Sequence, residues 1–134
     1  IDTNVFVGAC IGAGASNAVL RACFEHRFTP LMGAALLAHY EAVLGRDALF
    51  TNSGLDARER ESLLDVFLSL CEWTKVYCLW RPNLSDESDN HLIELAVAGG
   101  AEFIITRNLR DLQSSQMLFP ALRVISPEAF LKEL

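Results

Sequence analysis

Short apolar segments alternate with amphipathic helical segments along this chain, and that alternation limits the possible folds more than any other feature. Strands are predicted at residues 28–32, 75–79, 103–106 and 122–125, and the chain opens at the end of a further strand. Helices with apolar positions at a 3.6-residue spacing are predicted at residues 16–24, 34–44, 56–71, 91–98 and 126–134. Strands joined by helices form parallel sheets that helices cover on both faces. The sequence therefore predicts a single α/β domain over residues 1–134.

Three of the predicted helix ends carry recognisable signals. A glycine-rich loop at residues 8–14 leads to Ser16, which is a good N-cap residue. Asp56 and Glu59 have the spacing of a capping box at the start of the longest helix. The pair Gly99-Gly100 ends the following helix in the manner usual for helix C-termini.

The composition is that of a globular protein in a reducing compartment. Of the 134 residues, 51% are hydrophobic and 21% are charged, which excludes a disordered chain. No apolar run approaches the roughly 18 residues that span a bilayer, and no signal-peptide pattern is present. The four cysteines form no C-x-x-C pair, and no histidine lies at zinc-finger spacing, so structural thiols are predicted. We expect a cytoplasmic protein without membrane contact, and a few residues that precede Ile1.

The net charge of −6 argues against a general nucleic-acid binder, which usually carries a basic patch. The objection is weaker if several acids cluster around bound cations, because the cations cancel part of the negative charge. A basic local surface is still required, and its candidates are Arg21, His26, Arg27, Arg107 and Arg110.

Acids and other polar residues recur where predicted strands end. They are Asp2, Thr3 and Asn4 after the first strand, Asp86, Asp89 and Asn90 after the third, and Thr106, Arg107, Asn108 and Asp111 after the fourth. The carboxyl ends of parallel strands meet at one edge of the sheet, where α/β proteins bind their ligands. Mg²⁺ prefers oxygen ligands, and such an ion can polarise a phosphodiester and activate a water molecule. These residues therefore predict a divalent-metal site at this edge.

Each of these acids also has a simpler explanation. Asp2 could cap a turn, and Asp86 or Asp89 could stabilise the N-terminus of the helix that follows. Asp111 could be a solvated loop acid. The histidines at positions 26 and 91 are expected at the surface.

Several segments resemble one known family. Residues 1–7 (IDTNVFV) resemble the opening motif of PIN domains, and residues 86–96, 101–112 and 126–131 resemble the remainder of that family. More narrowly, the chain is similar to PIN proteins grouped as toxins of toxin–antitoxin systems, related to VapC-type toxins. The resemblance implies a three-layer α/β/α sandwich with a central, mostly parallel sheet. It also implies endonucleolytic cleavage of RNA by water activated on Mg²⁺ or Mn²⁺, a cognate antitoxin protein and a homodimer.

The resemblance assigns Asp2 as the first metal-binding acid and Asp89 as the third, with Asp86 beside it. The second acid of the family is a Glu in an E-Y-x-x-V-L pattern, and this chain has His39 at that position and Glu41 two residues later. At about 100° per residue, His39 and Glu41 fall on opposite flanks of the helix, so only one of them can face the site. Histidine can bind a metal or act as a base, and it suits Mn²⁺ better than Mg²⁺.

The fourth acid is also replaced. Many PIN domains have T-G-D where this chain has Thr106-Arg107-Asn108, and Asp111 follows three residues later. An amide at Asn108 keeps an oxygen ligand but loses a charge. Thr106 or Asn4 is expected to orient a carboxylate or the attacking water. Arg107 and Arg110 are candidates for contacts with substrate phosphates, unless they are only exposed residues at a helix tip.

Three functions are compatible with this pattern. The leading one is a metal-dependent endoribonuclease whose catalytic set is Asp2, Asp89, His39, Glu41 and Asn108. The second is a catalytically degenerate PIN domain that binds protein or RNA, which the histidine at position 39 favours. The third is a phospho-acceptor signalling domain, but neither Lys75 nor Lys132 is placed for the lysine that such a domain needs.

Overall fold

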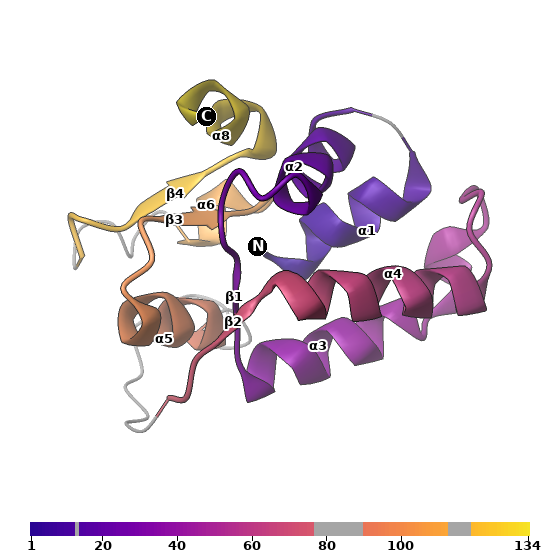
Figure 1. Ribbon diagram of the computed structural model, residues 1–134, viewed down its shortest axis with the longest axis horizontal. Helices are drawn as coiled ribbons and strands as arrows, with labels where there is room; N and C mark the ends of the chain where they lie inside the picture. The colour runs from indigo at the N-terminus through magenta and orange to yellow at the C-terminus, as the bar shows by residue number, and fades with distance from the viewer. Residues whose placement is uncertain (13, 77–89, 113–118) are drawn as a thin grey trace.

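Helices and short parallel strands alternate along the chain, which confirms the α/β class. The computed structural model describes residues 1–12, 14–76, 90–112 and 119–134. Its elements are α1 (Thr3–Ile11), α2 (Ala15–Phe24), β1 (Leu31–Met32), α3 (Ala34–Leu44), the 3-10 helix η1 (Asp47–Phe50), α4 (Ala57–Leu70), β2 (Glu72–Trp73), α5 (Asn90–Gly99), β3 (Phe103–Ile105), α6 (Leu109–Leu112), β4 (Arg123–Ile125) and α8 (Pro127–Glu133) (Figure 1).

The described strands form two separate pairs. β1 lies parallel to β2, and β3 lies parallel to β4. A cavity of about 460 Å³ lies between the pairs, and side chains of Leu31 and Ile104 are among those that line it. The single sheet expected from the sequence is therefore present, among these residues, as two pairs whose facing edges are not joined.

Helices cover both faces of the β3–β4 pair. Ile105 packs with Val19 of α2 and Phe130 of α8, whereas Ile104 belongs to the main core with Leu95 of α5. Figure 1 shows α2 and α8 together on one side of these strands and α5 on the other. Successive residues of a strand point to opposite faces, so this division follows directly from the sequence of β3.

The first helix was not predicted. Residues after Asp2 were expected to leave a strand and enter a glycine-rich loop, but α1 begins at Thr3. Its buried residues Val5, Phe6, Ala9 and Cys10 have helical spacing, and this periodicity is the stronger signal. Gly8 lies inside the helix. A Cβ atom at this position would lie 3.0 Å from the Ser16 hydroxyl oxygen, so a glycine fits there best.

Ser16 does not cap α2, contrary to the prediction. Gly14 is the N-cap residue, and Ser16 lies buried in the first turn of the helix. Its hydroxyl oxygen instead accepts hydrogen bonds from a distant arginine, described below. The predicted N-cap is therefore wrong because a long-range partner uses that side chain.

Other local signals are confirmed. Asp56 and Glu59 form the predicted capping box of α4, with the Glu59 amide donating to Asp56 Oδ1 at 2.8 Å and the Asp56 amide donating to Glu59 Oε1 at 3.1 Å. α3 has the predicted bounds. Gly100 follows α5 with a φ of 66°, which explains the glycine at this helix end.

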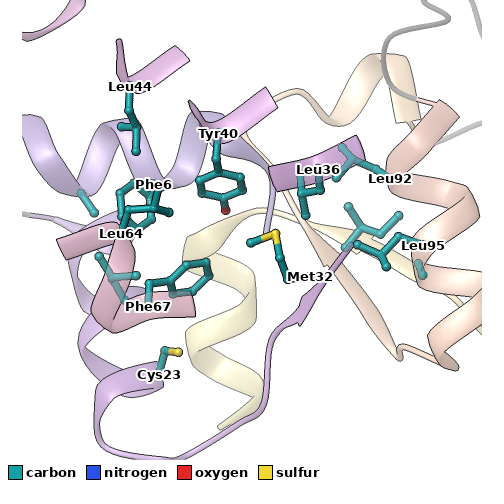
Figure 2. Close-up of a cluster of buried hydrophobic side chains, with 14 of the residues drawn as sticks. Phe6, Cys23, Met32, Leu36, Tyr40, Leu44, Leu64, Phe67, Leu92 and Leu95 are labelled. Carbon is teal, nitrogen blue, oxygen red and sulfur yellow. The ribbon is translucent and has the colours of Figure 1, made fainter. Parts of the chain in front are cut away.

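An aromatic cluster holds α1, α3 and α4 together (Figure 2). Phe6 lies 5.3 Å from both Tyr40 and Phe67, measured between ring centroids. The Tyr40 hydroxyl donates a hydrogen bond to the Ile1 carbonyl oxygen at 2.7 Å. The core therefore fixes the start of the chain, and with it the position of Asp2.

The strand predicted at residues 75–79 is wrong for residues 75 and 76, which the structure places outside any strand. The strand in this region is β2, which begins three residues earlier, and residues 77–79 lie outside the described ranges.

Within the described ranges, no single helix is long and apolar enough to cross a membrane. The bent pair of α1 and α2, which meet at 102°, meets these criteria together.

The described cysteines are structural thiols, as predicted. Cys10, Cys23 and Cys71 are free, and Cys78 lies outside the described residues. Burial raises the pKa of Cys10 and Cys23 to about 11 and that of Cys71 to about 12. These thiols therefore stay protonated and unreactive near neutral pH.

Candidate active site

Asp2 lies at the junction between an extended segment and α1. Its backbone is extended, and its amide donates a hydrogen bond to the Ile105 carbonyl oxygen at 2.9 Å. That bond seats Asp2 beside the carboxyl end of β3. The side chain is buried, with the residue 5% exposed. The polar residues after the first and the fourth predicted strands were expected to meet at one edge, and Asp2 and the end of β3 do so.

Three neutral side chains donate hydrogen bonds to the Asp2 carboxylate. Thr106 Oγ1 donates to Oδ2 at 2.7 Å, Asn4 Nδ2 donates to Oδ2 at 3.3 Å, and Thr3 Oγ1 donates to Oδ1 at 3.3 Å. Asn4 Nδ2 also lies 3.3 Å from Thr106 Oγ1. These contacts fix the orientation of the carboxylate without neutralising it.

No ion pair reaches the Asp2 carboxylate within the part of the chain that the structure describes. Burying a charged group is costly unless a countercharge or a metal compensates it. A buried carboxylate that is oriented by neutral donors is therefore a suitable ligand for a hard divalent cation.

A chain of hydrogen bonds connects Asp2 to Asp111, the other predicted acid in this region. Thr106 Oγ1 accepts from the Asn108 amide at 3.0 Å, and Asn108 Nδ2 donates to Asp111 Oδ2 at 2.8 Å. Asp111 is half-buried in α6 rather than in a solvated loop. Asn108 therefore links Asp111 to the same polar network as Asp2.

The Arg107 side chain already has protein partners. Its Nε and Nη2 atoms donate to Ser16 Oγ at 3.2 and 2.9 Å, and Nη1 pairs with Glu128 Oε1. The hydrogen bond from Arg107 lowers the pKa of Glu128. The Arg107 amide donates to Asn4 Oδ1 at 3.1 Å. Arg110 is exposed on α6.

Ser16 and Glu128 were not identified as site residues from the sequence. Ser16 was assigned as a helix cap, and Glu128 was given no role. Their contacts with Arg107 span 91 and 21 residues of sequence, so no local signal could have revealed them.

His39, on α3, lies against a second histidine, His91 on α5. The rings of His39 on α3 and His91 on α5 lie 5.5 Å apart between centroids, with an interplanar angle of 83°. His91 is half-buried, which corrects the expectation that it lies at the surface, whereas His26 is exposed as expected. Burial and the neighbouring His39 lower the pKa of His91, and Asp2 acts in the opposite direction.

The structure does not bring every predicted residue into this network. Glu41 is exposed, so of the two alternatives on α3 it is His39 that turns toward the interior. Asp86 and Asp89 lie outside the described residues. Among the residues that are described, no three His, Cys, Asp or Glu side chains are close enough to hold one metal ion.

Comparison with known proteins places the chain in a family. The sequence profile of the PIN domain matches residues 1–110, which is most of the chain. Searches of curated proteins and of solved structures each find no match. The matched region contains Asp2, Asn4, Thr106 and Asn108, and proteins of this kind are generally nucleases. The chain belongs to the PIN-domain family.

Proposed function

We propose that this protein is a metal-dependent endoribonuclease that hydrolyses RNA phosphodiester bonds. The observation that carries the proposal is the Asp2 carboxylate, which is buried, oriented by neutral donors and without a cationic partner among the described residues. Such a group is suited to bind Mg²⁺ or Mn²⁺. When bound, the ion polarises the phosphodiester and lowers the pKa of an attacking water molecule.

The proposal gives the chain's own residues separate roles. Asp2 is a metal ligand, with Asp89 and Asp86 as further ligands and Asp111 as a ligand that acts directly or through water. Thr106 and Asn4 hold the Asp2 carboxylate in place, and His39, rather than the exposed Glu41, takes the position of the family's second acid. Asn108 supplies a neutral oxygen in place of the fourth acid.

Two arginines are proposed to contact the RNA backbone. Arg107 has its guanidinium fixed by Ser16 and Glu128, so a phosphate would approach an arginine whose orientation is already set. Arg110 is exposed on the neighbouring helix and can reach phosphates by moving its flexible side chain.

The finer family features are proposals of the same kind. We propose a toxin of a toxin–antitoxin pair, with a cognate antitoxin protein that covers the site, a homodimer, and a cytoplasmic location. We also propose that residues 1–134 form one domain with the three-layer α/β/α arrangement of the family.

The experiment is an RNA cleavage assay. Purified protein is incubated with single-stranded and structured RNA in Mg²⁺, in Mn²⁺ and in EDTA. Two variants accompany it: Asp2→Asn, and Asp65→Asn as a matched control on the exposed face of α4. The proposal expects cleavage in at least one metal, its loss in Asp2→Asn and in EDTA, and its retention in Asp65→Asn. Cleavage that survives Asp2→Asn would show that a contaminating nuclease is responsible.

A second candidate is a degenerate PIN domain that binds RNA or protein without cleaving it. Two neutral residues favour it, since His39 and Asn108 stand where relatives carry acids, and fewer charges weaken divalent binding. In this case the wild-type protein would cleave in neither metal, and His39→Glu would restore cleavage.

A further inference from the structure

His39 and His91 form an isolated pair of imidazoles between two packed helices. They project from α3 and α5, which contact each other, and their rings are nearly perpendicular at 5.5 Å between centroids. The sequence separation of 52 positions means that only the packing of these helices brings the pair together. The chain's other histidine, His26, is exposed on a turn away from this pair.

Both imidazoles have an unused nitrogen. The Nδ1 atoms of His39 and His91 are shielded from solvent and have no hydrogen-bond partner anywhere in the described ranges. Leaving a buried polar atom without a partner is costly, so such atoms are rare unless a bound ligand satisfies them. Two of them on facing rings call for a common explanation.

The spacing of the rings fits a shared metal ion. One tetrahedral ion with ion–nitrogen distances of about 2.1 Å would hold two imidazole ring centres roughly 5 Å apart. The observed 5.5 Å separation lies close to this value, so small rotations of the two side chains would suffice.

We propose that His39 and His91 together bind one first-row transition-metal ion of the Zn²⁺ and Co²⁺ class. Imidazole nitrogens suit such ions, whereas Mg²⁺ prefers oxygen ligands throughout. The inference rests on the proposed function in one respect, since it assigns the metal preference of the site that Asp2 belongs to. His39 stands at the position of the family's second acid, and His91 is the additional ligand.

Asp2 is a metal ligand in the proposed function, but in the described arrangement it does not form one ligand cluster with the two imidazoles. Two protein ligands leave positions open for water and for a phosphate oxygen of the substrate.

The test measures metal binding without RNA. Metal-free protein is titrated with Co²⁺, Zn²⁺ and Mg²⁺ by calorimetry, and Co²⁺ binding is also followed by visible absorption. The variants are His39→Gln and His91→Gln, with His26→Asn as the matched control because asparagine tolerates the positive φ of 60° at that position. In the wild type, the imidazole ¹⁵N resonances are recorded with and without Zn²⁺, which keeps the test valid if a variant fails to fold.

The expected result is binding of one Co²⁺ or Zn²⁺ ion, and Zn²⁺ should shift the ¹⁵N resonances of two of the three imidazole rings. Each of the two glutamine variants should weaken this binding by about 10-fold or more. The control should bind as the wild type does.

Equal Co²⁺ and Zn²⁺ affinities in wild type and both glutamine variants, or unshifted imidazole resonances, would overturn the inference even if RNA is cut normally in Mg²⁺. Histidine-dependent binding without RNA cleavage in any metal would support the inference and refute the proposed function. The two failures are therefore distinguishable.

Discussion

Two buried charged residues of this molecule, Arg60 and Asp2, differ in the partners that surround them. Arg60 on α4 is 4% exposed, and its guanidinium donates to Asp47 Oδ1 at 2.7 Å, lies 4.1 Å above the Phe50 ring centre and approaches the Leu55 carbonyl oxygen. Asp2 is buried to the same degree, but its described partners are the neutral side chains of Thr3, Asn4 and Thr106. Among the described residues, the Arg60 charge has an ion-pair partner and the Asp2 charge has none.

The difference separates a structural charge from a functional one. Arg60 closes the corner between η1 and α4, where its ion pair and its stacking on an aromatic ring contribute to folding. Asp2 has no cationic partner among the described residues, so a bound cation would compensate its charge. Removing each charge should therefore have opposite effects on stability and on activity.

The largest expected effect is on catalysis, in Asp2→Asn. Losing a metal ligand should lower the rate of RNA cleavage by about 100- to 1,000-fold. The stability of the metal-free protein should stay equal or rise, because an uncompensated buried charge is removed. Cleavage rates and thermal melting in EDTA test the two halves separately. A melting temperature well below that of the wild type would mean that Asp2 is structural, and the contrast with Arg60 would disappear.

The next effect is on stability, in Arg60→Ala. This change removes the ion pair with Asp47, the contact with Phe50 and the packing of a long side chain, so unfolding should become easier by about 2 kcal/mol. Chemical denaturation measures the loss, and Arg58→Ala on the exposed side of the same helix is the control. Cleavage by the folded variant should change less than about 2-fold. A large loss of activity at full folding would break the distinction between the two charges.

Local signals predicted the scaffold better than the site. The capping box at Asp56 and the bounds of α3 follow from patterns within one element, and the structure confirms them. The approach of Asp2 to Thr106 followed from a general rule, since ligand sites of α/β proteins lie at the carboxyl ends of strands.

The errors have a common physical origin. α1 was missed because glycine is a poor helix former, although Gly8 packs closely against Ser16 of α2. Ser16 was assigned to a helix cap because its contact with Arg107 depends on tertiary structure. His91 was expected at the surface, and only the packing of α5 against α3 buries half of it. Such contacts join distant segments, so a single sequence does not contain a local record of them.

A smaller effect is expected in Thr106→Val, which keeps the shape of the side chain and removes the hydroxyl. The Asp2 carboxylate would lose its shortest hydrogen bond, and the Asn108 amide would lose its acceptor. Removing a hydrogen bond that orients a metal ligand lowers activity by about 10- to 100-fold. Thr106→Ser retains the hydroxyl and should recover most of the rate. Equal activities of the valine and serine variants would show that Thr106 does not position Asp2.

The smallest effect concerns another charge pair, Arg107 with Glu128, whose two side chains are exposed. Because Arg107 lowers the pKa of Glu128 below its usual 4.5, the pair contributes stability above that pH and loses it as the pH falls through the lowered pKa. Exposed pairs contribute less than about 1 kcal/mol, so Glu128→Gln should change stability by no more than this at pH 7, and the difference from wild type should vanish in acid. Denaturation curves at pH 7 and pH 3 test the sign. A difference that grows in acid would mean that Glu128 acts on the fold through contacts other than Arg107, and a difference at pH 7 as large as that of Arg60→Ala would move this pair into the structural class.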